Sequence, residues 1–122
     1  MDIPMAGAPP ATTGNALTPE LKAEWDQLLA NNDLVLFMKG DPDAPQCGFS
    51  ARAAAVLQHL GHPFTHVNVF NQTNPMQVIQ AIAEYSQFPT LPQVWVKGEL
   101  IGGSDIAVEM LENGELAEML AE

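Results

Sequence analysis

The spacing of hydrophobic residues predicts alternating helices and short strands along this chain of 122 residues. In the segment 18–32, apolar residues recur every three or four positions, as they do on one face of a helix. Thr18 suits the N-cap of that helix, and Pro19 suits its first turn, where a missing N–H costs nothing. The continuous apolar run at residues 33–39 is typical of a strand that is buried on both faces.

The rest of the chain continues this alternation. We expect helices over residues 50–61, 74–86 and 104–122, a strand over 64–70, and a hairpin over 92–103. Gly61 is placed to end the first of these helices, and Asn113-Gly114 to interrupt the last. The order of elements predicts an α/β domain over residues 18–122, with a four-stranded mixed sheet flanked by helices. Residues 1–17, which carry Pro, Ala, Gly and Thr without periodicity, are expected to form a flexible tail.

Charge narrows the classes of partner. The net charge is −11, from fifteen acidic residues against four basic ones. Phosphates and anionic lipids would repel such a chain, so neither nucleic acid nor a membrane is an expected partner. No apolar run reaches the ~20 residues of a membrane span, and the N-terminus lacks the basic and apolar regions of a signal peptide. With a single cysteine there is no disulfide framework, so the cytoplasm is the expected compartment.

The candidate chemistry centres on the only cysteine, Cys47, in the segment KGDPDAPQCGFS at residues 39–50. A helix is expected to begin at or just after Cys47, where N–H groups and the helix dipole lower the pKa of a thiol below ~8.5. Lys39 would add positive potential. Flanking prolines and a glycine favour a reactive thiol at a loop apex over a buried, inert cysteine. Ser50 stands where a C-x-x-C motif has its second thiol, so a partner sulfur must come from outside the chain.

Two separated segments resemble the monothiol, CGFS-type glutaredoxin family. The first is KGDPDAPQCGFS, and the second is FPTLPQVWVKGELIGGSDI, residues 88–106. The similarity runs from about Leu17 to the C-terminus. It implies a thioredoxin fold with a cis proline, which agrees with the order of elements, and makes residues 18–122 a glutaredoxin domain.

The resemblance also implies a glutathione site. Its expected members are Lys39, Cys47, Phe49, Leu91, Pro92, Gly103, Ser104 and Asp105. In the family the lysine binds a carboxylate of glutathione, the cysteine binds iron or forms a mixed disulfide, and a cis proline frees the preceding backbone to pair with the ligand. The G-G-x-D turn offers N–H groups to the γ-glutamyl carboxylate, and Asp105 suits the ammonium group. Taken singly, a trans proline, a tight turn and a capping aspartate are structural alternatives.

The chain departs from the family pattern at three positions. Ile79 stands where an arginine usually holds the glycine carboxylate, Ser104 where many members carry another cysteine, and Phe88 where tryptophan is common. Gln77 or Gln80 could donate a neutral hydrogen bond instead. Losing the charge-assisted bond would cost ~1 kcal/mol or more.

The resemblance leaves several functions open. A [2Fe–2S] cluster commonly takes four thiolates. The family's homodimer supplies them from two chains and two glutathiones. The leading hypothesis is therefore a carrier that transfers such a cluster to client apoproteins in iron–sulfur assembly, with glutathione and the cluster as cofactors. The alternative is a glutathione-dependent thiol-disulfide oxidoreductase with Cys47 as its nucleophile. A third role, compatible with the first, is binding to a BolA-family protein.

Other residues with candidate chemistry are interpreted as structural. Met76, Met110 and Met119 are expected in the core. Asp41 and Asp43 are expected to be a solvated loop pair rather than an acid/base couple.

Overall fold

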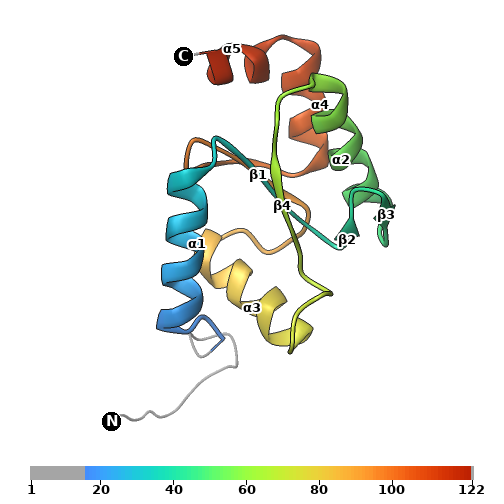
Figure 1. The fold of residues 1–122 in the computed structure, drawn as a ribbon. Helices are drawn as coiled ribbons and strands as arrows, with labels where there is room; N and C mark the ends of the chain where they lie inside the picture. The colour runs from blue at the N-terminus through green and yellow to red at the C-terminus, as the bar shows by residue number, and fades with distance from the viewer. Residues whose placement is uncertain (1–15, 122) are drawn as a thin grey trace.

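The elements follow the predicted order, with one additional hairpin (Figure 1). The computed structural model describes residues 16–121. The helices are α1 (Pro19–Asn31), α2 (Gly48–Leu60), α3 (Pro75–Ser86), α4 (Ser104–Glu112) and α5 (Glu115–Ala121). The strands are β1 (Leu34–Met38), β2 (Gly40–Asp41), β3 (Ala44–Pro45), β4 (Thr65–Asn68), β5 (Gln93–Val96) and β6 (Glu99–Gly102). Within residues 16–121 no helix is long and apolar enough to cross a lipid bilayer.

The helix ends carry the signals seen in the sequence. The Thr18 hydroxyl accepts a hydrogen bond from the Leu21 N–H at 3.1 Å and caps α1, with Pro19 at its first position. Gly61 ends α2 in a left-handed conformation, with φ at 80°. The predicted break between α4 and α5 lies at Asn113-Gly114. These predictions are confirmed.

Four strands form one mixed sheet in the order β4-β1-β5-β6. β1 runs parallel to β4 and antiparallel to β5, and β5 is antiparallel to β6. Lys97 and Gly98, both with positive φ, form the two-residue turn between β5 and β6. The predicted four-stranded sheet is therefore present, with β4 and β6 as its edges.

Strand β1 is buried because both faces of the sheet are covered. Successive β1 side chains point to opposite faces of the sheet, so Leu36 packs in one apolar cluster and Phe37 in another. Both side chains are fully buried. Helices α2, α4 and α5 contribute to the first cluster, and α1 and α3 to the second. Figure 1 shows α1 and α3 on one side of β1, and α2 and α4 on the other. Burial on both faces explains why β1 is apolar throughout.

The cluster between α1, α3 and the sheet is aromatic. Trp25 meets the rings of Phe37 and Tyr85 edge to face, with centroids 5.5 and 5.4 Å apart. Trp95 packs against the same Phe37 and Tyr85 rings, at 6.5 and 5.8 Å. We call Trp25, Phe37, Tyr85 and Trp95 the aromatic cluster.

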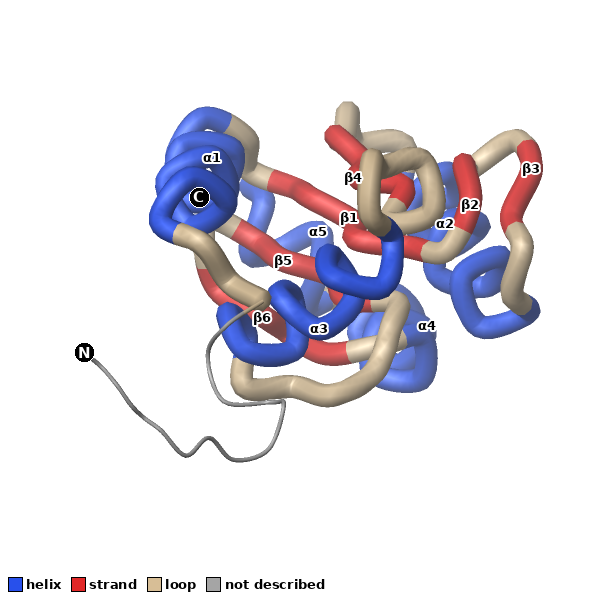
Figure 2. Tube along the Cα trace, turned by 90° about the horizontal axis from the view of Figure 1, so that it is seen from below, coloured by secondary structure: helices blue, strands red, loops and turns tan. Residues whose placement is uncertain are grey.

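Two predictions were wrong. The segment after β1, expected to be a proline-rich loop, contains the β2–β3 hairpin, which extends beyond the end of β1 (Figure 2). Two-residue strands are too short to show an alternating pattern, so the sequence carries no signal for them. Met76, expected in the core, is 63% exposed, whereas Met110 and Met119 pack against the first cluster as expected. Met76 lies in the first turn of α3, and the buried residues of that helix begin at Val78.

The predicted tail, residues 1–17, lies outside the described residues except for its last two positions. Ala16 is buried, and its carbonyl oxygen accepts a hydrogen bond from the Gln77 side chain at 3.1 Å. The Leu17 N–H donates to the Glu84 carboxylate at 3.1 Å. These two residues therefore pack against α3 rather than belonging to a tail.

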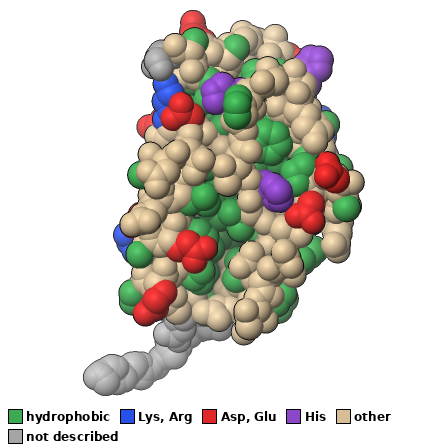
Figure 3. All heavy atoms as spheres, in the orientation of Figure 1, with side chains coloured by type: hydrophobic (Ala, Val, Ile, Leu, Met, Phe, Trp, Pro, Cys, Tyr) green, Lys and Arg blue, Asp and Glu red, His purple; other side chains and the backbone are tan. Residues whose placement is uncertain are grey.

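The surface carries the charge imbalance of the sequence. Figure 3 shows acidic side chains scattered over the face that β4 crosses, with few basic ones among them. Lys22 pairs with Asp26 within α1 at 2.8 Å.

A second carboxylate, that of Asp41, contacts His66 Nε2 at 3.1 Å, so Asp41 is not simply the solvated loop residue that was predicted.

Candidate functional site

Cys47 occupies the N-cap position of α2, where the sequence predicted a helix start. Its backbone is extended, and the helix begins at Gly48. The Cys47 carbonyl accepts the first helical hydrogen bond, from Ala51 N–H at 2.9 Å. The N–H groups of the first turn are left without helical partners and lie next to the half-buried sulfur.

This placement favours the thiolate. The Ser50 N–H lowers the pKa of the Cys47 thiol most, by hydrogen bonding to the sulfur. The Phe49 N–H, the charge of Lys39 and the Ser50 hydroxyl lower the pKa further, while partial burial opposes them. The net result is a pKa below the ordinary value of a cysteine thiol, as predicted from the helix start.

Ser50 has a second role that the sequence did not reveal. Its side chain is fully buried, and its Oγ accepts a hydrogen bond from the Lys39 N–H at 3.0 Å. The residue that takes the place of a second thiol therefore ties the end of β1 to the first turn of α2. No local pattern could have shown this, because the two groups are 11 residues apart.

One pocket of about 700 Å³ brings together every residue proposed for the site. Its lining includes Lys39, Cys47, Phe49, Leu91, Pro92, Gly103, Ser104 and Asp105. The Leu91–Pro92 peptide bond is cis, as the family resemblance implied. Ile79, Phe88, Pro89, Thr90 and Ile106 complete the lining.

The start of α4 forms one wall of this pocket. Gly103 is the N-cap and provides no side-chain cap. Ser104, at the first helical position, is buried, with 6% of its surface exposed. Gly102, before it, has φ at 138°, and a Cβ there would lie 2.9 Å from Cβ of Ile106. The glycine pair thus lets the chain turn sharply into α4, whose first residues line the pocket and whose first N–H groups have no partner within the helix.

Asp105 at the pocket rim pairs with Arg52 of α2. Arg52 Nη1 donates to Asp105 Oδ1 at 3.0 Å. Both side chains are largely exposed, so solvent screens the pair. The arginine bond uses one of the two carboxylate oxygens, Oδ1. Sequence reasoning missed this contact, which joins residues 53 positions apart.

Much of the rest of the pocket lining is apolar. Ile79 of α3 lines the pocket at the position where an arginine was expected from the family pattern. Phe49 is 60% exposed and Ile106 is 41% exposed beside the same opening. Among the described lining residues, Lys39 is the only cation.

A single chain offers few side chains for metal ligation. In residues 16–121 no three His, Cys, Asp or Glu side chains gather as a set of metal ligands. Cys47 is the only thiol in the sequence, so a thiolate-ligated centre would need further ligands from outside the chain.

Comparison with known proteins agrees with these features. The glutaredoxin family model matches residues 34–101. A monothiol glutaredoxin of Synechocystis is 48% identical over 104 residues, covering 85% of this chain and 94% of the relative. A reduced apo glutaredoxin of poplar is 43% identical with a TM-score of 0.72, covering 87% of this chain and 94% of that chain.

A more distant neighbour is a glutaredoxin of buckwheat, solved in complex with glutathione. It is 26% identical with a TM-score of 0.71, over 82% of this chain and 86% of that one. The matches confirm the thioredoxin fold of the four-stranded sheet. With the Cys-Gly-Phe-Ser sequence at the start of α2, they show that the chain belongs to the monothiol glutaredoxins.

Proposed function

We propose that two copies of this protein bind a glutathione-ligated [2Fe–2S] cluster and pass it to client apoproteins. The observation that carries this proposal is the solitary thiol of Cys47, with its lowered pKa, in an open pocket. Four thiolates are needed, and a dimer with two glutathiones provides them. The cluster is cargo, and ligation by a dissociable small molecule suits its release.

The pocket offers a complementary site for glutathione. The N–H groups at the start of α4 suit the γ-glutamyl carboxylate, and Asp105 suits the neighbouring ammonium. Lys39 suits the other carboxylate, and Leu91 and Phe49 suit the cysteinyl portion. These assignments place the ligand's sulfur beside Cys47.

Partners and compartment follow from the same chemistry. A thiol that must stay free suits a reducing compartment such as the cytoplasm. A BolA-family protein is a candidate partner at the cluster face, next to the exposed Phe49.

The lowered pKa of Cys47 also favours a second function, glutathione-dependent reduction of mixed disulfides. The Cys47 thiolate would attack the glutathione sulfur of a protein–glutathione disulfide and release the protein thiolate, which takes up a proton. A free glutathione thiolate would then attack the new Cys47–glutathione disulfide. That step restores Cys47 and forms oxidised glutathione, so Ser50 need not act as a second thiol.

Anaerobic reconstitution with iron, sulfide and glutathione tests the first function. The expected product is a coloured dimer on gel filtration that loses its colour and dissociates when glutathione is removed. A colourless monomer under these conditions would refute the carrier proposal. Rapid turnover of a glutathionylated peptide by that monomer would instead support the oxidoreductase.

A further inference from the structure

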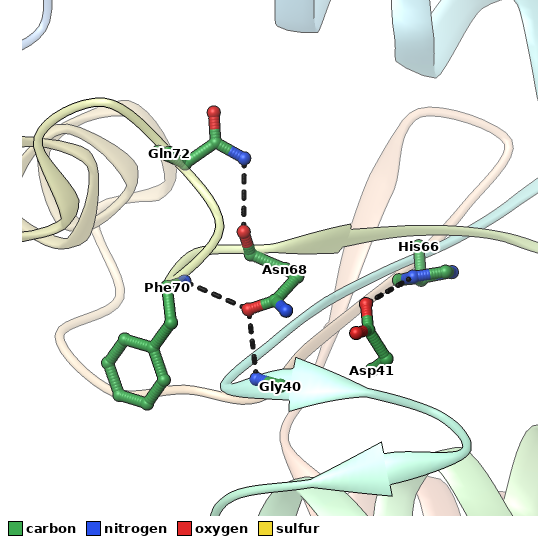
Figure 4. Close-up of polar contacts among 6 residues, drawn as sticks. All are labelled: Gly40, Asp41, His66, Asn68, Phe70 and Gln72. Atoms are coloured by element: carbon green, nitrogen blue, oxygen red, sulfur yellow. Dashed lines mark hydrogen bonds and ion pairs between the residues drawn. The ribbon is translucent and has the colours of Figure 1, made fainter.

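The end of strand β4 is bonded to the start of the β2–β3 hairpin (Figure 4). The side-chain oxygen of Asn68 accepts hydrogen bonds from the Gly40 N–H at 3.0 Å and the Phe70 N–H at 2.9 Å. The main-chain oxygen of Asn68 accepts a third bond, from the Gln72 side chain at 3.0 Å. Asn68 thus ends β4 and at the same time holds the first residue of β2.

The position held by Asn68 has little room for adjustment. Gly40 has φ at 101°, and a Cβ there would lie 2.7 Å from two backbone atoms, the Ala44 oxygen and the Gln46 nitrogen. The two strands of the hairpin therefore lie in close backbone contact at Gly40. A shift of Gly40 would be passed on to the segment that leads to Cys47.

The residue before Gly40 contacts the chain on both sides of Cys47. The Lys39 carbonyl accepts a hydrogen bond from the Gln46 N–H at 2.9 Å, one residue before the thiol. The Lys39 N–H donates to the Ser50 hydroxyl at 3.0 Å, three residues after it. A continuous set of bonds thus runs from Asn68 through Gly40 and Lys39 to the two flanks of Cys47.

We propose that Asn68 is a positioning residue for Cys47, because it anchors the Lys39–Gly40 segment that brackets the thiol. It touches neither the thiol nor the pocket, and acts through the main chain of Lys39 and Gly40. The inference rests on Cys47 being the working thiol of the proposed function. The contact between His66 and Asp41 at 3.1 Å joins β4 to the same hairpin, but its exposed partners make it the weaker attachment.

The two ends of β4 provide a matched control. At its start the Thr65 hydroxyl donates to the Asn32 side chain at 2.9 Å, in a bond far along the strand from the hairpin. Thr65→Val removes one side-chain hydrogen bond of β4 without touching the Gly40 contact. Asn68→Leu and Asn68→Ala remove the acceptor at the other end, the first with a side chain of similar size.

The test is the pH dependence of alkylation of the full-length protein by iodoacetamide. Cys47 is the only cysteine, so the rate reports on this thiol alone, without glutathione or iron. Loss of the Asn68 acceptor should move the first-turn N–H groups and Lys39 away from the sulfur and raise the pKa of the thiol. We expect the profile to move to higher pH, with a rate about three-fold lower than that of the wild type on its rising limb, where the thiolate fraction limits the reaction. Thr65→Val should follow the wild-type profile.

The variants must first give the circular dichroism spectrum and cooperative unfolding of the wild type. If Asn68→Leu does not fold, Asn68→Ala decides, because a smaller side chain cannot clash. A folded Asn68 variant with the wild-type alkylation profile would overturn the proposal. An equal slowing by Thr65→Val would also overturn it, because the effect would then reflect general loosening of β4. Neither result depends on whether the protein carries a cluster, so failure here is distinct from failure of the proposed function.

Discussion

The aromatic cluster and the Cys47 pocket are both built mainly from apolar side chains, yet they differ in closure. Phe37 of the aromatic cluster is fully buried, with rings on two sides of it. Phe49 at the pocket is 60% exposed. The same residue type therefore contributes burial energy in one place and an open contact surface in the other.

The comparison also separates two uses of polar groups. In the aromatic cluster, the Tyr85 hydroxyl donates to Asp26 at 2.7 Å, and burial together with that carboxylate raises the pKa of Tyr85. The tyrosine is thereby kept protonated. In the pocket, N–H groups and Lys39 lower the pKa of Cys47, so the charged form is favoured instead. Polar contacts complete the packing of one region and prepare the other for reaction.

Cys47→Ser gives the largest expected effect and confines it to the pocket. The hydroxyl is neither a thiolate ligand nor a nucleophile at this position, so cluster assembly and mixed-disulfide formation should both be lost. Visible absorption after reconstitution and intact mass after incubation with oxidised glutathione measure these losses. The free energy of unfolding, measured in urea, should change by less than about 1 kcal/mol, because the sulfur is only half-buried. Retained cluster absorption would show that ligation does not need this thiol.

Phe37→Ala and Phe49→Ala make one substitution in each region. The first should lower the free energy of unfolding by about 3–5 kcal/mol, because it leaves a cavity among fully packed rings. The second should change it by less than about 0.5 kcal/mol, because Phe49 is exposed. Urea denaturation of both variants measures the difference. Equal losses would mean that Phe49 packs in the folded protein as Phe37 does.

Asp105→Asn tests the charged rim of the pocket. If the carboxylate receives the ammonium of glutathione, its neutralisation should weaken glutathione binding about ten-fold, through loss of a charge-assisted hydrogen bond. Glu109→Gln, one turn along α4, removes the same charge outside the pocket lining and serves as control. Calorimetric titration with glutathione compares the two. Equal weakening in both variants would indicate a general effect of charge and not a contact by Asp105.

Ile79→Arg should have the smallest effect of these substitutions, and it changes an apolar residue of the pocket lining. A guanidinium at this position would reach the same pocket as Lys39 and should strengthen glutathione binding about five-fold, or ~1 kcal/mol. Gln80→Arg adds the same charge at the next position, which does not line the pocket. Its affinity should remain close to that of the wild type. An unchanged affinity in Ile79→Arg would mean that another group already holds the carboxylate.

Local patterns allowed much of this molecule to be predicted. The buried β1 strand, the caps at Thr18 and Gly61 and the helix start at Cys47 depend on residues within a few positions of one another. The pattern of apolar residues and the stereochemistry of caps are local, so a sequence displays them directly. The resemblance supplied the cis proline and the eight residues that line one pocket.

Other features had no local signal. The exposure of Met76 depends on which residues of α3 reach the apolar cluster, and the β2–β3 hairpin is held by contacts rather than by strand propensity. The pairing of Arg52 with Asp105 joins two helices that are adjacent only after folding. Each depends on how distant elements pack, which periodicity does not encode.

By itself, the sequence determined that a single thiol would stand at the start of a helix, with no second cysteine in the chain. The tertiary structure decided how that thiol is held. Asn68 lies 21 positions after Cys47 in the sequence. Its side chain accepts a hydrogen bond from Gly40 and so supports the segments on either side of the sulfur. The reason is physical: a helix start is made by neighbouring residues, but its placement depends on hydrogen bonds between strands that only the folded sheet brings together.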